Sequence, residues 1–170
     1  MEFNSSCTFG KTLFVGIMTL VLSTGLFAAK TLDAKNIAKM LDEVKIAKEH
    51  KNINSMKKHF LSRTSVSLTE QDIEETKTQR LTFNEYKRYL SRYWKTVQSN
   101  LIEVKERKID ISDNGKSALV KSTFVQTVEI KGVKIETTIY ETTGISLIKG
   151  KIYINYFSAR KMLNTSLQVN

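Results

Sequence analysis

The sequence contains no proline and a single cysteine. Without proline, tight turns must be made by Gly, Asn and Asp, and proline-rich linkers are excluded. The cysteine, Cys7, precedes an apolar segment near the start of the chain. A bacterial lipoprotein signal carries its cysteine directly after the apolar segment, so that type of signal is excluded. Once a leader containing Cys7 is removed, the chain has neither a disulfide nor a thiol nucleophile.

Histidine and glycine are also scarce. His50 and His59 are nine residues apart, whereas two metal ligands on one face of a helix are roughly four residues apart. The glycines are scattered at turns and form no phosphate-binding loop, and no nucleophile elbow is present. The sequence therefore predicts no metal site, no cofactor and no catalytic residue set, and it disfavours hydrolase and redox chemistry.

Positive charge is in excess, with 27 Lys and Arg against 17 Asp and Glu and a net charge of +10. Such an excess favours acidic partners, including nucleic acid, anionic lipid and acidic proteins. The lysines are spread along the chain, however, in short pairs such as Lys57-Lys58 and with no basic run of five or more. We assign this charge to a solvated surface and do not expect nucleic acid as a partner.

An uncharged, largely apolar run covers residues 12–29, follows Lys11 and ends in Ala28 and Ala29. This pattern is typical of a secretory signal peptide, here residues 1–29. The run is also close to the length of a bilayer span, so an uncleaved inner-membrane anchor is the alternative, and only this alternative makes the membrane a partner. In both cases the body of the protein is exported. We predict a periplasmic or secreted bacterial protein, with the inner-membrane-anchored form as the alternative.

The rest of the chain has the size and apolar content of one domain, which we place at residues 30–163, followed by a polar C-terminal tail at 164–170. Its first half has helical periodicity. Asp33 is expected to cap a first helix, whose apolar positions are Ile37, Met40, Leu41 and Val44. A second, short helix is expected to start at Asn54 as its cap and to turn Met56 and Phe60 toward the core.

The next segment, residues 62–80, is rich in Ser, Thr and Glu. We expect a polar loop with a short strand at Ser65–Leu68 and a helical turn at Gln71–Thr76. A solvated connection is the simpler interpretation, and a lid over a pocket is the alternative.

A third helix is marked by Thr82 and Glu85, which have the spacing of a capping box. Its predicted apolar face carries Phe83, Tyr86, Leu90, Trp94 and Val97, with Tyr89 and Tyr93 at the edge. Such an aromatic face normally belongs to the core. The alternative is that Tyr86, Tyr89 or Tyr93 turns its hydroxyl into a cavity.

From Leu101 to Phe157 the apolar residues alternate, which indicates strands. Three turn signals divide this region, at Asp113-Asn114-Gly115, Lys131-Gly132 and Lys149-Gly150. A change of alternation predicts a bulge near Glu106–Lys108, and Gly144 allows a break or bulge in a later strand. After the last strand we expect a short helical turn around Ala159–Leu163.

Three stretches of this sequence resemble the nuclear transport factor 2-like superfamily, also called the cystatin-like α+β cone. They are KNINSMKKHFLSRTSVS from Lys51, LTFNEYKRYL from Leu81 and YETTGISLIKGKIYINYF from Tyr140. The resemblance implies an α+β fold in which three N-terminal helices pack on a curved antiparallel sheet of about four to six strands. It also implies a ligand site in the cone between the helices and the sheet.

The predicted pocket residues are Tyr86, Tyr93, Trp94, Phe124 and Glu141. Glu141 has the same alternation as Ile139 and is the candidate for a catalytic base, although an ion-paired or rim position is the simpler interpretation. We expect a non-enzymatic protein that binds a small apolar ligand or a protein partner, and we expect a homodimer. One alternative is an inner-membrane-anchored periplasmic subunit resembling type IV secretion components. The other is a small lyase or isomerase that uses Tyr86, Tyr93 or Glu141.

Overall fold

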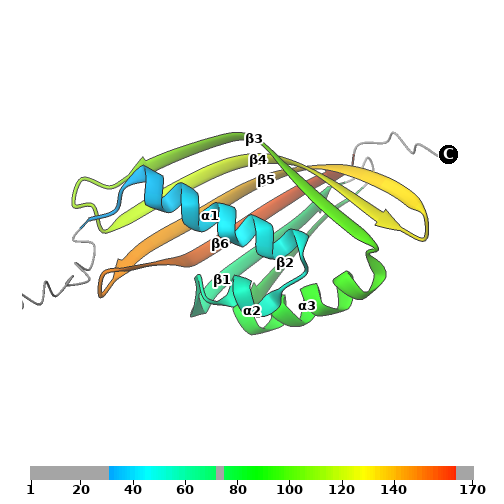
Figure 1. Cartoon of the computed structure of the whole chain (residues 1–170), viewed down its shortest axis with the longest axis horizontal. Coiled ribbons are helices and arrows are strands. Elements are labelled where there is room, and N and C mark those ends of the chain that lie inside the picture. Colours follow the sequence, from blue (N-terminus) through cyan, green and yellow to red (C-terminus); the bar gives the residue numbers. More distant parts are fainter. Residues whose placement is uncertain (1–30, 72–74, 164–170) are drawn as a thin grey trace, which may run out of the picture.

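A computed structural model describes residues 31–71 and 75–163 of the chain. The elements follow in the order α1 (Ala34–Glu49), α2 (Ile53–Lys57), β1 (Phe60–Gln71), β2 (Thr76–Thr82), α3 (Phe83–Thr96), β3 (Ser99–Ile111), β4 (Ser117–Ile130), β5 (Val133–Ile148) and β6 (Lys151–Leu163). The strands form one curved sheet with the order β2-β1-β6-β5-β4-β3, and the helices lie on one face of it (Figure 1). The predicted α+β class and the three helices are confirmed. The predicted leader, residues 1–29, and tail, residues 164–170, lie outside the described residues.

Hydrogen-bonded caps define where the first two helices begin. Asp33 accepts a hydrogen bond from the backbone of Asn36, as predicted. The second helix is capped by Asn52, whose side chain accepts from Ser55 N, so the prediction of Asn54 as the cap is wrong. Asn54 lies inside the first turn, and Met56 N, two residues after it, already donates to the Asn52 carbonyl oxygen.

Glycine and asparagine turns connect the strands from β3 to β6. Lys131 and Gly132 both have positive φ, and so do Lys149 and Gly150, which is the conformation of a type I′ hairpin turn. Gly115 also has positive φ, at +63°, and its carbonyl oxygen accepts a hydrogen bond from Leu32. All three predicted hairpins are therefore confirmed.

The inner face of β4 is buried at every second residue, from Ala118 to Val128, as the alternation predicts. The bulge in β3 lies between Val104 and Glu106, directly before the predicted range Glu106–Lys108. It brings Ile109 and Ile111 onto the same inner face as Ile102, where they pack against the core. A second irregularity lies beside Gly144, where a break or a bulge in β5 was predicted. The extra residue is Asn155 in β6, and β5 continues unbroken past Gly144 to Ile148.

Residues 62–80 contribute most of a β-hairpin. The strand predicted at Ser65–Leu68 lies within β1 and is confirmed, whereas the rest of the segment was predicted as a loop with a helical turn. β1 pairs antiparallel with β2 from Ser65–Thr82 to Gln71–Thr76, so Gln71 and Thr76 end and begin strands. The loop prediction failed because β2 is an edge strand that is exposed except at the half-buried Leu81 and carries no apolar alternation. Residues 72–74, within the predicted turn, lie outside the described residues.

The end of the chain also differs from the prediction. Ala159–Leu163 is not a helical turn but the continuation of β6, which pairs with β5 on one side and β1 on the other. The β1–β6 pair is parallel, so the sheet is mixed rather than fully antiparallel. β1 and β6 are far apart in sequence and are not joined by a hairpin, so no local turn residues in the sequence indicate that they pair.

The two longer helices cover different parts of the sheet. α1 packs against β3, while α3 packs against β1 and β2, so the inner face of the central strands lies between them (Figure 1). Arg107 Nη1 on β3 donates to Asp42 Oδ1 on α1 at 2.9 Å, and Glu49 Oε1 accepts from Ile102 N at 2.9 Å. These contacts fix α1 at the β3 edge of the sheet.

The capping box of α3 should be a measurable part of its stability. Thr82 N donates to Glu85 Oε2 at 2.8 Å, and Thr82 Oγ1 accepts from Glu85 N at 3.3 Å. Thr82→Ala should destabilise the protein by about 1 kcal/mol and lower Tm by about 3 °C. Ser91→Ala, at an exposed position of the same helix, is the control and should leave Tm nearly unchanged. Equal effects of the two changes in thermal unfolding would show that the cap contributes nothing.

Candidate functional site

The helices and the inner face of the sheet enclose a cavity of about 80 Å³. Its apolar wall consists of Leu41, Val44, Leu68, Leu90, Trp94, Ile102, Phe124, Ile139, Phe157 and Ala159. An enclosed water needs roughly 10–15 Å³ by the same measure. The cavity therefore has room for several waters or for part of a small organic molecule.

All five residues predicted for a pocket lie on this wall. Tyr86 and Trp94 come from α3, Phe124 from β4 and Glu141 from β5, and each of these four is less than 10% exposed. Tyr93, also on α3, is only half-buried. The structure brings these five residues together around one space, whereas the binding role assigned to them stays a prediction.

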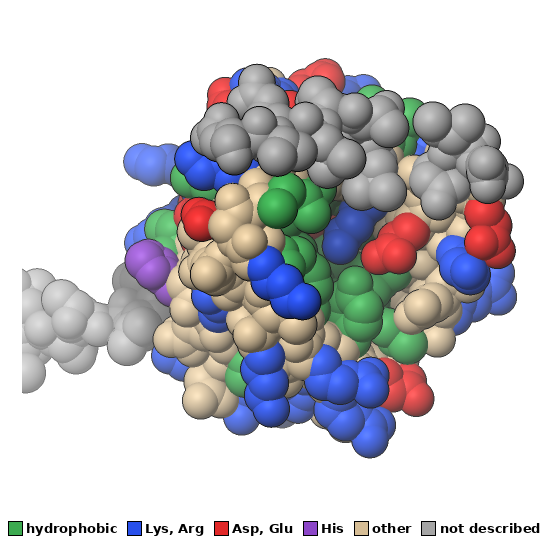
Figure 2. Space-filling model, turned by 90° about the vertical axis from the view of Figure 1, so that its right-hand side faces the viewer, with side chains coloured by type: hydrophobic (Ala, Val, Ile, Leu, Met, Phe, Trp, Pro, Cys, Tyr) green, Lys and Arg blue, Asp and Glu red, His purple; other side chains and the backbone are tan. Residues whose placement is uncertain are grey.

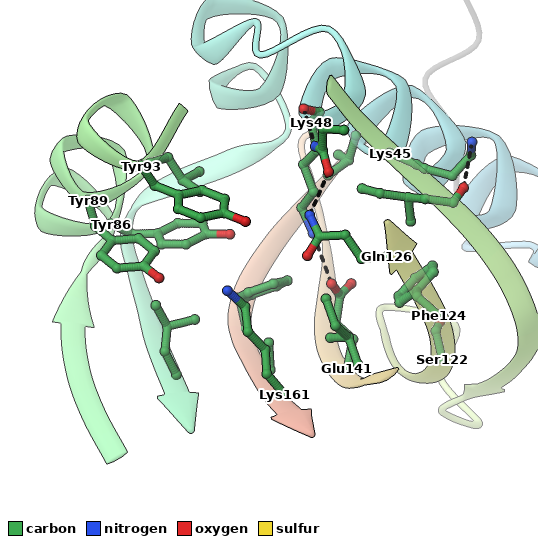
Figure 3. A pocket seen from close by; sticks show the side chains of 18 of the residues that line it. Lys45, Lys48, Tyr86, Tyr89, Tyr93, Ser122, Phe124, Gln126, Glu141 and Lys161 are labelled. Carbon is green, nitrogen blue, oxygen red and sulfur yellow. Dashed lines mark hydrogen bonds and ion pairs between the residues drawn. The ribbon is translucent and has the colours of Figure 1, made fainter. Parts of the chain in front are cut away.

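Three tyrosines of α3 line one side of the cavity (Figure 3). Their rings stack in a row, with centroids 6.5 Å apart for Tyr86 and Tyr89 and 6.2 Å apart for Tyr89 and Tyr93. The Tyr89 hydroxyl donates to Glu70 Oε1 at 3.4 Å. Among the residues that the structure describes, neither the Tyr86 nor the Tyr93 hydroxyl has a hydrogen-bond partner. Both are available to a ligand.

Burial changes the acidity of these phenols. It raises the pKa of Tyr86 far above its usual value, and the nearby Glu141 carboxylate adds to this effect. Burial, followed by Glu70 and the neighbouring tyrosines, raises the pKa of Tyr89 to about 12. The pKa of Tyr93 is raised by burial and then by Glu70. All three hydroxyls are therefore protonated hydrogen-bond donors at neutral pH.

An ion pair crosses the cavity from α1 to the sheet. Lys48 Nζ lies 2.9 Å from Glu141 Oε2, and the exposed side-chain fractions are 16% for Lys48 and 7% for Glu141. The other carboxylate oxygen of Glu141 accepts from Thr143 Oγ1 at 3.1 Å. The Lys48 amine also lies 4.7 Å from the centre of the Phe157 ring. Glu141 does point inward, and both of its oxygens are engaged by the protein.

Two side-chain amides extend the polar contacts of the Lys48–Glu141 pair. Gln126 Nε2 donates to Asn100 Oδ1 at 2.7 Å, and Asn100 Nδ2 donates to the Lys48 carbonyl oxygen at 2.9 Å. These two hydrogen bonds connect β4 and β3 to the C-terminal end of α1. A buried polar network that is satisfied in this way fixes the relative position of its elements.

Lys161 is a residue of the cavity wall that the sequence did not reveal. It was assigned to a helical turn, whereas β6 continues and turns Phe157, Ala159 and Lys161 inward. The alternation of these three residues was the available signal. The Lys161 amine extends from β6 toward the tyrosines (Figure 3) and lies 5.1 Å from the centre of the Tyr93 ring.

A wider depression adjoins the cavity and shares Tyr93, Gln126 and Lys161 with it. It measures about 370 Å³ and has both charged residues, such as Glu70 and Lys77, and apolar ones on its wall. Figure 2 looks at this end of the molecule and shows hydrophobic side chains within a hollow, with basic and acidic side chains around it. Because it shares these residues with the cavity, we infer that this depression is the entrance to the cavity.

The histidines lie outside the cavity wall. His59 Nε2 is 3.4 Å from Glu43 Oε2, and burial lowers its pKa while Glu43 opposes the change. No cluster of three or more His, Cys, Asp and Glu side chains suited to a metal exists within residues 31–71 and 75–163. In the same part of the chain, no helix combines the length and the hydrophobicity that crossing a membrane requires.

No protein-family model and no curated protein sequence matches this chain. Solved structures do match. A candidate scytalone dehydratase from Novosphingobium aromaticivorans has a TM-score of 0.61 and 14% identity, with 80% of this chain and 88% of that chain covered. A nuclear transport factor 2-like protein from Cytophaga hutchinsonii has a TM-score of 0.59 and 11% identity, with 76% and 98% covered. A protein of unknown function with a cystatin-like fold from Nostoc punctiforme has a TM-score of 0.55 and 12% identity, with 81% and 98% covered.

Identities this low carry information about the fold alone. The matches extend over at least three quarters of the chain, and they agree with the six-stranded curved sheet and the helices packed on its inner face. The chain has the fold of the nuclear transport factor 2-like superfamily.

Proposed function

We propose that the cone of this protein binds a small, largely apolar molecule and holds it without chemical change. The observation that carries this proposal is the cavity itself, since protein interiors are close-packed and seldom keep voids larger than a water molecule. Its wall is mainly aliphatic and aromatic, with a few polar groups at defined places, which is the usual composition of a small-molecule site.

The chemistry of the wall also supports binding rather than catalysis. A general base must be free to take up a proton at neutral pH. Glu141 is engaged by Lys48 and Thr143, and the tyrosines are protonated. The described part of the cavity wall contains no histidine. These groups can orient a ligand, and none is poised to abstract a proton.

We propose in addition that the protein is exported, on the strength of the apolar run at residues 12–29. The ligand would then be taken up outside the cytoplasm. An uncleaved leader would instead support the inner-membrane-anchored assembly subunit. Sequencing the N-terminus of the mature protein separates the two, because cleavage near Ala28 or Ala29 removes the anchor.

The single tryptophan of the chain, Trp94, is a reporter for the cavity because it lies on its wall. Titration with neutral probes such as 1-hexanol and toluene should shift or quench its emission and raise Tm, because a ligand that binds the native state stabilises it. No response of either signal up to the solubility limit of both probes would contradict binding in the cone.

A filled cavity should abolish the response. Ser122 lies on the cavity wall, so Ser122→Leu places an isobutyl group in the space that a ligand would occupy. This variant should stay folded and lose at least about tenfold in probe affinity, corresponding to about 1.4 kcal/mol. Thr123→Leu puts the same side chain on the opposite face of β4 and should bind like the wild type. A response in Ser122→Leu equal to that in Thr123→Leu would place the probe elsewhere.

The second candidate function is a lyase or isomerase with Glu141 as base. It is supported by the inward position of Glu141 and by structural neighbours that include dehydratase candidates. The two functions make different demands on Glu141. If the Lys48 ion pair holds Glu141, removing the carboxylate destabilises the protein, whereas a carboxylate that is free to act as a base could be removed with little loss of stability.

A double-mutant cycle distinguishes these roles. Glu141→Gln leaves the Lys48 ammonium buried without its counter-charge and should cost about 3 kcal/mol, as should Lys48→Met. The double variant Lys48→Met/Glu141→Gln should lose at least about 1 kcal/mol less than the sum of the two single changes. Glu103→Gln, in the exposed pair with Lys105, is the control and should cost under about 0.5 kcal/mol. Urea unfolding measures all four, and a nearly neutral Glu141→Gln would favour the catalytic role.

The outer face of the sheet supports the expected homodimer. Leu119, Tyr140 and Tyr156 are 40–42% exposed there, on the neighbouring strands β4, β5 and β6. We propose that this face pairs two subunits. Sedimentation should then give twice the monomer mass for the wild type and the monomer mass for Tyr140→Glu. A monomeric wild type at micromolar concentration would exclude this dimer.

A further inference from the structure

The charges around the cavity are not evenly matched. Three lysines, Lys45, Lys48 and Lys161, lie on its wall together with one acid, Glu141. Lys45 is 3.0 Å from Glu49 on its own helix, and Lys48 is 2.9 Å from Glu141. These two lysines have close protein partners.

Lys161 lacks an equivalent partner among the described residues. Its one ion pair there is with Glu70, whose Oε1 is 3.9 Å from the Lys161 amine, too far for a hydrogen bond. The Glu70 side chain is 61% exposed and also accepts from Tyr89, so water screens most of its charge. The Lys161 side chain itself is only 24% exposed.

The pKa of the Lys161 amine agrees with this incomplete pairing. Burial lowers its pKa, Glu70 acts in the opposite direction, and Lys48 lowers the pKa further. A buried ammonium without a close counter-charge is costly, and a bound anion relieves that cost. The Tyr93 ring, 5.1 Å away, interacts with the ammonium, and its hydroxyl is a second free donor beside it.

We propose that the ligand of the cone is a monocarboxylate with a short apolar body, whose carboxylate binds the Lys161 amine at the entrance to the cavity. This inference rests on the proposed function, because it names the class of molecule that the cone binds. The apolar body extends inward from Lys161 toward Trp94 and Phe124. A dianion such as a phosphate monoester fits less well, because the described wall offers no arginine and only one ammonium without a close partner.

The position of Lys161 fits this role. Lys161 lies on the wall of both the cavity and the wider depression, so a carboxylate held there stays close to solvent. The apolar end of the ligand then occupies the aliphatic and aromatic part of the wall. Both ends of the molecule are matched, and neither Lys48 nor Glu141 has to give up its partner.

Hexanoate and 1-hexanol test this assignment, since they have the same hydrocarbon chain and differ in charge. With Trp94 emission as the signal, hexanoate should bind the wild type at least about tenfold more tightly than 1-hexanol, as expected for a hydrogen bond between charged groups. Lys161→Met keeps the side chain up to the position of Cε and removes the charged amine. In this variant the affinity for hexanoate should fall to that for 1-hexanol, which should bind as it does to the wild type.

Lys151→Met, at an exposed position of the same strand, is the matched control and should keep the preference for hexanoate. Thermal unfolding of Lys161→Met without ligand checks that it folds, and removal of the buried charge should raise its Tm. Equal affinity of the wild type for the two probes, or an unchanged preference in Lys161→Met, would overturn the carboxylate assignment and leave the proposed function standing. No response to either probe would overturn both.

Discussion

The Lys48–Glu141 ion pair is the interaction on which the interior of this protein depends. It spans the space between α1 and β5 in the middle of the sheet, so it couples a helix to a central strand. Long side chains reaching toward each other hold their backbones apart, whereas short apolar side chains would allow helix and sheet to close. Thr143 donates a hydrogen bond to the remaining carboxylate oxygen of Glu141. The buried pair therefore needs no water or ligand from the adjacent cavity to complete its hydrogen bonds.

Curvature of the sheet provides the other boundary of the cavity. The pairing is irregular in three places, between Phe60 and Ser65, between Val104 and Glu106, and after Gly144. Gly144 allows the close approach of β6, since a Cβ there would lie 2.6 Å from Asn155 Oδ1. Irregularities of this kind increase local twist and bend a sheet around whatever it encloses. A flat sheet of the same composition would pack directly against the helices.

Sequence patterns predicted those parts of the fold that local chemistry determines. The hairpins at Lys131-Gly132 and Lys149-Gly150 require positive φ, and the α3 cap requires an acceptor at Thr82, so each leaves a signal within a few residues. The parallel β1–β6 pair leaves none, because it joins segments about ninety residues apart, such as Ser65 and Tyr156. The edge strand β2 has Leu81 as its one apolar residue, so it has no alternation to detect.

The same distinction explains which site residues were foreseen. Tyr86, Trp94 and Phe124 belong to clear apolar faces, so their inward direction followed from periodicity. Lys161 was missed because its direction depends on β6 continuing between two partner strands, which is a tertiary effect. The consequence is chemical as well as structural. The periodicity of the aromatic residues alone predicts an apolar cavity. The continuation of β6 adds the incompletely paired Lys161 ammonium at the entrance, so the cavity has a polar end and an apolar end. A ligand that matches both ends must be amphipathic and must enter with its apolar end first.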